Sequence, residues 1–176
     1  MRDPGHYVQF FDGDDSFVAA TCRFIQEGIE SGCTCIVVVT PARSEKIEAR
    51  LRESGLDPAA LAAAYSYIAL DARSTLATFM KDGRIDSRHF HNDMGLLMRQ
   101  AASRGQPVYA VGEAASLLME DGLATTAVQL EELWNELSRH HSFTLFCTYV
   151  RAPFTSASTR RTFDQICAIH SHVLTG

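Results

Sequence analysis

The stretch that decides the fold is QFFDGDDSFVAATCRFIQEGIESGCTCIVVVT, residues 9–40. A short apolar run ends in an acidic turn, a helical pattern follows, and a second, β-rich run closes the segment. In a nucleotide-binding α/β protein, that first turn would be rich in glycine and would end in Lys-Ser or Lys-Thr. Here the turn carries Asp12, Asp14 and Asp15 and no lysine, so it repels phosphate instead of cradling it. No nucleotide is expected to bind at this turn.

The rest of the chain continues the alternation of strand-like and helix-like segments. Apolar runs predict strands at 6–11, 34–40, 65–70, 107–112 and 142–150. Helical patterns cover 16–31, 41–54, 72–81, 87–104, 124–140 and 159–174. The continuous apolar character of CIVVV and TLFCTYV is typical of central strands that are covered on both faces. We expect a three-layer α/β fold whose mostly parallel central sheet has about five strands, with helices on both faces.

Short polar residues mark the expected helix starts. The candidates for capping side chains are Asp15 or Ser16, Thr40 (before Pro41), Asp71, and Asp86 or Ser87. In the last segment, an apolar stripe indicates a helix packed on the core, and its members are Phe163, Ile166, Cys167, His170, Val173 and Leu174.

Composition limits the kinds of protein to consider. The 176 residues, 46% of them hydrophobic, fit a single domain over residues 1–176. A net charge of −5 gives no support to direct binding of nucleic acid or of an anionic membrane. The start of the chain lacks the pattern of a signal peptide, and the five scattered cysteines are typical of reduced thiols. We expect a cytoplasmic protein.

The expected ligand site is the crevice at the carboxyl ends of the parallel strands. Asp12 and Glu113 directly follow two of the strands, and Tyr149 lies near the end of a third. Glu131 and Asn135 share one helix face because they are four residues apart, so they could close the crevice from the side. We expect Asp12, Glu113 and Tyr149 to converge there. Apolar walls from Phe11, Leu117 and Trp134 would suit a small organic ligand better than a polyanion.

Structural roles compete with these assignments. Glu113 could be a helix N-terminal carboxylate stabilised by the helix dipole, although we expect it to face a cavity and not a salt bridge. A tyrosine and a cysteine on a buried strand, such as Tyr149 and Cys147, are usually core residues.

The histidine pairs at 89/91 and 170/172 are two residues apart, so on a helix their side chains diverge and do not chelate a metal locally. A solvated or capping role is expected for them. We expect no metal, no cofactor and no catalytic residue.

Six short motifs resemble those of one family. They are HYVQFFDGDD, FIQEGIESGCTCIVVV, IALDARSTLATFMKDGRID, VYAVGEAASLL, LEELWNEL and FCTYVRAPF, in this order. The chain is similar to the MEDS domain, the sensory domain of methanogens, methylotrophs and the dichloromethane-dehalogenase regulator. The residues that match the family pattern are His6, Asp12, Asp71, Gly83, Gly112, Glu113, Glu131, Asn135, Cys147 and Tyr149. On this basis His6 joins the candidate ligand-binding residues.

The resemblance implies a fold and a function. It implies a relative of the RecA/KaiC ATPase fold that lacks the Walker A motif, and a non-catalytic domain that senses a small organic compound such as a hydrocarbon derivative. The family passes its signal to a DNA-binding or histidine-kinase module. The 176 residues leave no room for such a module, so we expect a regulatory partner in trans. Two alternatives stay open, namely a divergent ATPase that uses Glu113 and a pure interaction module that forms a homodimer.

Overall fold

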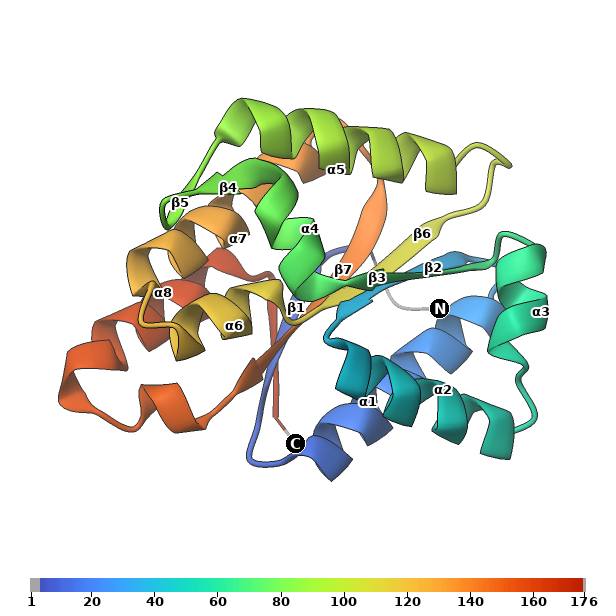
Figure 1. Ribbon diagram of the computed structural model, residues 1–176, viewed down its shortest axis with the longest axis horizontal. Coiled ribbons are helices and arrows are strands. Elements are labelled where there is room, and N and C mark those ends of the chain that lie inside the picture. Colours follow the sequence, from blue (N-terminus) through green and yellow to red (C-terminus); the bar gives the residue numbers. More distant parts are fainter. Residues whose placement is uncertain (1–3, 176) are drawn as a thin grey trace.

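The centre of the molecule is a six-stranded sheet in the order β3-β2-β6-β7-β1-β8, and its neighbouring strands run parallel (Figure 1). The computed structural model describes residues 4–175. The strands of this sheet are β1 (His6–Phe11), β2 (Thr34–Val39), β3 (Tyr67–Asp71), β6 (Val108–Gly112), β7 (Phe143–Val150) and β8 (His172–Leu174). A separate antiparallel hairpin joins β4 (Met80–Lys81) to β5 (Arg84–Ile85).

Helices cover both faces of the sheet, so the predicted three-layer α/β fold is confirmed. The helices are α1 (Asp14–Glu30), α2 (Pro41–Glu53), α3 (Pro58–Ala63), α4 (Ala72–Phe79), α5 (Ser87–Ala101), α6 (Ala114–Glu120), α7 (Ala124–Ser138) and α8 (Arg160–Ile169). Two 3-10 turns, η1 (Ala152–Phe154) and η2 (Ala157–Thr159), precede α8. Figure 1 shows α1, α2 and α3 on one side of the sheet and α4 to α8 on the other. The arrangement is compatible with the RecA-like architecture that the family resemblance implies.

Each face of the sheet has its own apolar core, and the central strands supply both. In β2, Ile36 and Val38 pack with α4 to α8, whereas Cys35 and Val37 pack with α1 and α2. Successive side chains of a strand point to opposite faces. Every position of β2 is therefore buried, which explains its unbroken apolar sequence.

Several helix starts follow the predicted caps. The side chain of Asp71 accepts a hydrogen bond from the backbone N–H of Ser74, and that of Asp86 accepts bonds from Arg88 and His89. Thr40 precedes Pro41 at the start of α2 but makes no side-chain cap. The first helix begins at Asp14, with Gly13 and not Asp15 or Ser16 at its N-cap.

The end of the chain differs from the prediction of one helix over 159–174. Helix α8 ends at Ile169, and His172–Leu174 forms β8, in which Val173 pairs with Val8. Without β8, the backbone groups along one side of β1 would be unpaired, and a strand there satisfies them. The short α3, α6, β4 and β5 were also missed, because elements of so few residues give little periodic signal.

Within residues 4–175, no helix combines the length and the apolar character needed to cross a membrane.

Candidate functional site

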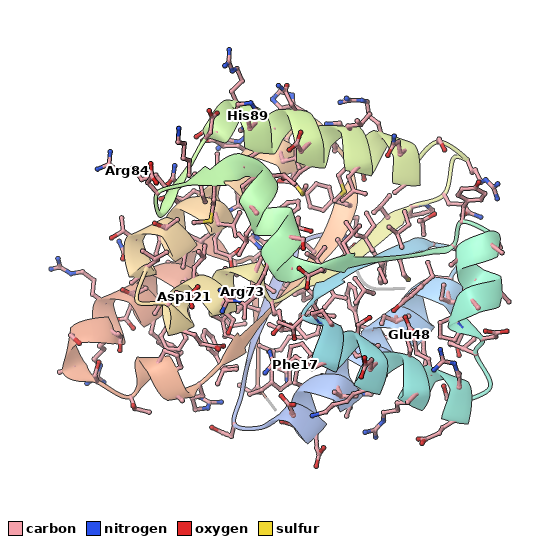
Figure 2. The ribbon with its side chains drawn as sticks, viewed as in Figure 1. Phe17, Glu48, Arg73, Arg84, His89 and Asp121 are labelled. Atoms are coloured by element: carbon pink, nitrogen blue, oxygen red, sulfur yellow. The ribbon has the colours of Figure 1, made fainter. Side chains whose placement is uncertain are left out.

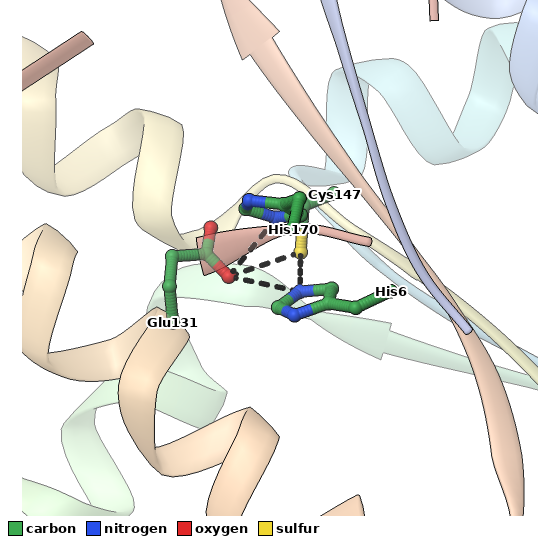
Figure 3. Close-up of side chains that lie close together, drawn as sticks. All are labelled: His6, Glu131, Cys147 and His170. Atoms are coloured by element: carbon green, nitrogen blue, oxygen red, sulfur yellow. Dashed lines mark hydrogen bonds and ion pairs between the residues drawn. The ribbon is translucent and has the colours of Figure 1, made fainter. Parts of the chain in front are cut away.

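Four buried side chains from four separate elements meet on the sheet face covered by α7 and α8 (Figure 3). They are His6 of β1, Glu131 of α7, Cys147 of β7 and His170 at the end of α8, and we call them the quartet. One atom from each side chain can be chosen so that all four lie within 4.8 Å of one another. Glu131 Oε2 lies 3.2 Å from His6 Nε2, 3.2 Å from Cys147 Sγ and 3.6 Å from His170 Nε2.

The sheet register brings two members of the quartet together. Val8 of β1 lies opposite Cys147 of β7. His6 precedes Val8 by two residues, so its side chain lies on the same face of the sheet as that of Val8. His6 Nε2 lies 3.2 Å from Cys147 Sγ. Helix α7 crosses this face and presents Glu131, whose neighbour Leu130 belongs to the same core.

The electrostatics of the quartet centre on Glu131, which is 0% exposed. Burial by itself would raise the pKa of the Glu131 carboxyl, but His170, His6 and the Tyr149 hydroxyl together lower this pKa to about 2. Burial and the charge of Glu131 raise the pKa of both the Cys147 thiol and the Tyr149 phenol well above their ordinary values. Burial lowers the pKa of His170, although Glu131 opposes this effect. At neutral pH the centre is therefore a carboxylate that accepts hydrogen bonds from a neutral thiol and a neutral phenol.

Hydrogen bonds at the far side of each imidazole fix the orientation of the two rings. Asn135 donates its amide N–H to the carbonyl of Ile169, so its Oδ1 is turned toward His6 Nδ1 at 2.9 Å. His170 Nδ1 donates to the carbonyl of Ile166 at 2.6 Å. Both rings therefore carry a proton on Nδ1 and present Nε2 to Glu131. His170 Nε2 is buried and makes no hydrogen bond to any described residue.

A narrow cavity of about 30 Å³ adjoins the quartet between the sheet and helices α4, α5 and α7. Its walls are almost entirely apolar and include Val38, Ala110, Met94, Leu130 and Trp134. Glu131, Cys147 and Tyr149 also line it, and the hydroxyl of Tyr149 donates to Glu131 Oε1. Arg73 and Asp121 form an exposed ion pair that links the start of α4 to the end of α6 (Figure 2).

Glu113 forms a buried salt bridge, which corrects the expectation that it would have none. The side chain is fully buried, and its two oxygens accept hydrogen bonds from the backbone N–H of Thr40 and from the guanidinium of Arg43. Arg43 comes from α2, whose position beside the end of β6 the sequence pattern did not reveal. A buried carboxylate needs a charged or hydrogen-bonding partner, and here α2 supplies both.

Two of the three carboxylates of the acidic turn pair with basic side chains. Asp12 is highly exposed and pairs with Arg151 at 3.0 Å. Asp14 pairs with Arg43 at 3.0 Å and with Lys46. The three side chains that were expected to converge each have a different partner. Asp12 pairs with Arg151, Glu113 pairs with Arg43, and Tyr149 donates to Glu131. Of the expected apolar walls, Trp134 lines the cavity, whereas Phe11 belongs to the core on the other face of the sheet.

Four of the six predicted ligand-binding residues do lie together. Glu131 and Asn135 contact the same ring, because His6 Nε2 faces Glu131 and His6 Nδ1 faces Asn135. Tyr149 completes the group through its bond to Glu131.

A model of the MEDS family, described as the methanogen/methylotroph, DcmR sensory domain, matches residues 5–171. The chain belongs to the MEDS family. A search among curated proteins found no match. The matched range includes all four residues of the quartet, so the buried polar centre lies within the part of the chain that the family model covers. Membership supports a sensory role.

Sequence reasoning missed His170 as a partner of the MEDS domain's polar centre. The prediction of a solvated role is correct for His89, which is half-exposed on the outer side of α5 and pairs with Asp86 (Figure 2). For His170 the solvated alternative is wrong because its side chain is buried, whereas the capping alternative holds, since His170 ends α8 and its Nδ1 donates to the carbonyl of Ile166. A usable signal was present, since His170 continues the apolar stripe of Ile166 and a histidine on such a stripe points to the core.

Proposed function

We propose that this MEDS domain, as a single domain over residues 1–176, senses a small organic molecule that enters the cavity beside Glu131 and Tyr149. The observation that carries the proposal is the cavity itself. Its apolar walls end at a hydrogen-bonded carboxylate and phenol, the combination that small-molecule sites use for affinity and orientation. Family membership supports the sensory role.

The cavity favours a very small ligand. Its volume of about 30 Å³ exceeds the roughly 10–15 Å³ that a cavity needs to hold one water molecule, but not by much. A one- or two-carbon hydrocarbon derivative with one hydrogen-bonding group matches that size after a small displacement of α4 or α5. A nucleotide would need a far larger space and cationic donors for its phosphates.

Helix α7 is the element best placed to transmit the signal. It supplies Glu131 and Trp134 to the cavity and Asn135 to His6, so a ligand that displaces Trp134 would also pull on the contacts of β1 and α8. A regulatory protein in trans, a histidine kinase or a transcription factor, would read this change. Both oxygens of Glu113 are engaged by Thr40 and Arg43, which supports a non-catalytic role over an ATPase that uses this carboxylate.

Filling the cavity tests the proposal. Ala110 of β6 lines the cavity, and Ala110→Val adds two methyl groups inside it. Binding of ¹³C-labelled methanol, ethanol and dichloromethane would be followed by line broadening and by chemical-shift changes of the Trp134 indole. We expect at least one of these compounds to bind the unaltered domain, and its affinity for Ala110→Val to be at least tenfold lower.

Ala69→Val is the matched control, because Ala69 is an exposed strand alanine outside the cavity. It should bind as the unaltered domain does. Equal binding by all three proteins, or no response of Trp134 to any of the three compounds, would reject this cavity as the ligand site.

A further inference from the structure

The quartet has the composition and the spacing of a transition-metal site. Two imidazoles, a thiolate and a carboxylate are ligands that Zn²⁺ and related cations accept. In a tetrahedral zinc site with ordinary bond lengths, neighbouring ligand atoms are about 3.3–3.6 Å apart. The distances in the quartet are 3.2 Å for three pairs and 3.6 Å for His170 Nε2 to Glu131 Oε2. The two remaining pairs, which join His170 to His6 and to Cys147, lie within 4.8 Å, so the His170 side chain would have to shift toward the other three for all four atoms to surround one ion.

The orientation of the rings favours a cation at this point. Both imidazoles direct Nε2 at a carboxylate oxygen while Nδ1 is occupied by Asn135 or by the Ile166 carbonyl. For neutral rings, this arrangement sets nitrogen lone pairs against an anion, which is repulsive unless a positive charge lies between them. The buried His170 Nε2 has no hydrogen-bond partner among the described residues, and it lies 3.6 Å from Glu131 Oε2, so it can serve as a metal ligand on that side.

The residues around the quartet resemble the outer shell of known metal centres. Metal-binding histidines usually donate their second N–H to a carbonyl or carboxylate, and bound carboxylates are themselves hydrogen-bonded. Here Asn135 and Ile166 accept from the histidines, and Tyr149 donates to Glu131 Oε1 and leaves Oε2 for the centre. These contacts would hold all but the thiol in place before any ion binds.

We propose that His6, Glu131, Cys147 and His170 bind one divalent cation of the zinc class. Binding replaces the thiol proton of Cys147, so the ion takes up a thiolate, a carboxylate and two neutral imidazoles, and one proton leaves. Two negative ligands then balance the two charges of the ion, which suits a site without solvent. His6 also lines a surface hollow with Asn135, Ser138 and Ser171, and this hollow gives a cation a route to the centre.

This inference stands apart from the proposed sensing of an organic ligand, because its observables need no organic compound. The competing state of the quartet is metal-free, with a proton on His6 or His170 as the counter-charge of Glu131. The two states are distinguished by the number of metal ions bound per chain, by the absorption spectrum with Co²⁺, and by the number of protons released when metal is added.

The test is titration of the reduced, metal-stripped domain with Co²⁺, followed by displacement with Zn²⁺. We expect one cobalt per chain, visible bands of tetrahedral intensity, a thiolate-to-cobalt charge-transfer band, and release of about one proton per ion at neutral pH. Cys147→Ser keeps a hydroxyl that can donate to Glu131. It should lose the charge-transfer band and bind Zn²⁺ at least about 100-fold more weakly, since even outer-shell changes cost 10–100-fold.

Cys35→Ser is the matched control, because Cys35 is an equally buried strand cysteine that packs in the core on the other face of the sheet. It should give the spectrum and affinity of the unaltered domain. A metal-stripped domain that binds no stoichiometric cobalt would overturn the proposal, as would a cobalt complex without a thiolate band. The spectrum of the unaltered domain decides the matter even if Cys147→Ser fails to fold.

Discussion

Replacing Arg43 with methionine should destabilise the domain strongly, because the change leaves the carboxylate of Glu113 buried without its counter-charge. Glu113 is 0% exposed, and among residues 4–175 Arg43 is the only charged side chain that forms an ion pair with it. Removing one partner of a buried ion pair costs about 3–5 kcal/mol. Methionine retains an unbranched side chain that can cover Phe17, over whose ring the guanidinium lies at 4.3 Å. The expected loss therefore comes mainly from the unpaired charge.

Thermal and urea unfolding would measure this effect. For a domain of this size, 3–5 kcal/mol corresponds to a fall in Tm of about 6–20 °C. Glu113→Gln should cost less, about 1.5–3 kcal/mol, because it removes a charged hydrogen bond but leaves no buried anion. In the double variant the two losses should be clearly less than additive.

Lys46→Met is the control for Arg43→Met. Lys46 lies on the same helix and pairs with the same Asp14, but it is half-exposed, so its ion pair should be worth less than about 1 kcal/mol. If Arg43→Met and Lys46→Met cost the same, or if the double variant is fully additive, Glu113 is not held by Arg43 in the way described.

Two further predictions concern a helix cap and a close helix–sheet contact. Asp71→Ala removes the cap that accepts from Ser74 and should cost about 1 kcal/mol at pH 7. Hydrogen bonds from Ser74 lower the pKa of the Asp71 carboxyl below 3.8. The contribution of this carboxylate to the free energy of unfolding is therefore present above that pH, and it is lost as the pH falls through the folded-state pKa. Unfolding curves of Asp71→Ala and of the unaltered domain should converge in acid, whereas Asp71→Asn should keep a cap without this pH dependence. A difference in stability between Asp71→Ala and the unaltered domain that persists below the folded-state pKa would contradict the role of the Asp71 carboxylate as the cap. Gly28→Ala gains about 1 kcal/mol of helix propensity. It should still destabilise the domain, since the new Cβ would lie 2.7 Å from Cys35 Sγ and 3.2 Å from the Tyr109 ring. Combination with Cys35→Ala should recover much of the loss, and the absence of any recovery would show that the clash lies elsewhere.

Much of the fold follows from local sequence patterns. The alternation of apolar runs and helical stripes predicted five strands of the main sheet, and the unbroken apolar character of CIVVV predicted burial on both faces. Asp71 and Asp86 cap helices as expected, because a cap depends only on a side chain and the backbone a few residues away. The absence of a lysine in the acidic turn is likewise a local fact.

The candidate site was only partly predictable. The shared helix face of Glu131 and Asn135 follows from a spacing of four residues, and both side chains do contact His6. Their common partner did not follow, because it depends on how α7 lies across β1. The rule that ligand sites lie at the carboxyl ends of parallel strands placed Glu113 at the correct edge of the sheet. It could not reveal Arg43, which reaches Glu113 from α2.

The sequence by itself determined the elements, the layers and the lack of a phosphate-binding turn, since these depend on hydrophobic periodicity, capping and charge over short stretches. Only the tertiary structure decided which polar groups meet. His6, Glu131, Cys147 and His170 are spread along nearly the whole chain, and they lie together because β1 pairs with β7 while α7 and α8 pack on the same face. Side chains so far apart in sequence are brought into contact by strand register and helix packing, which are properties of the folded chain as a whole.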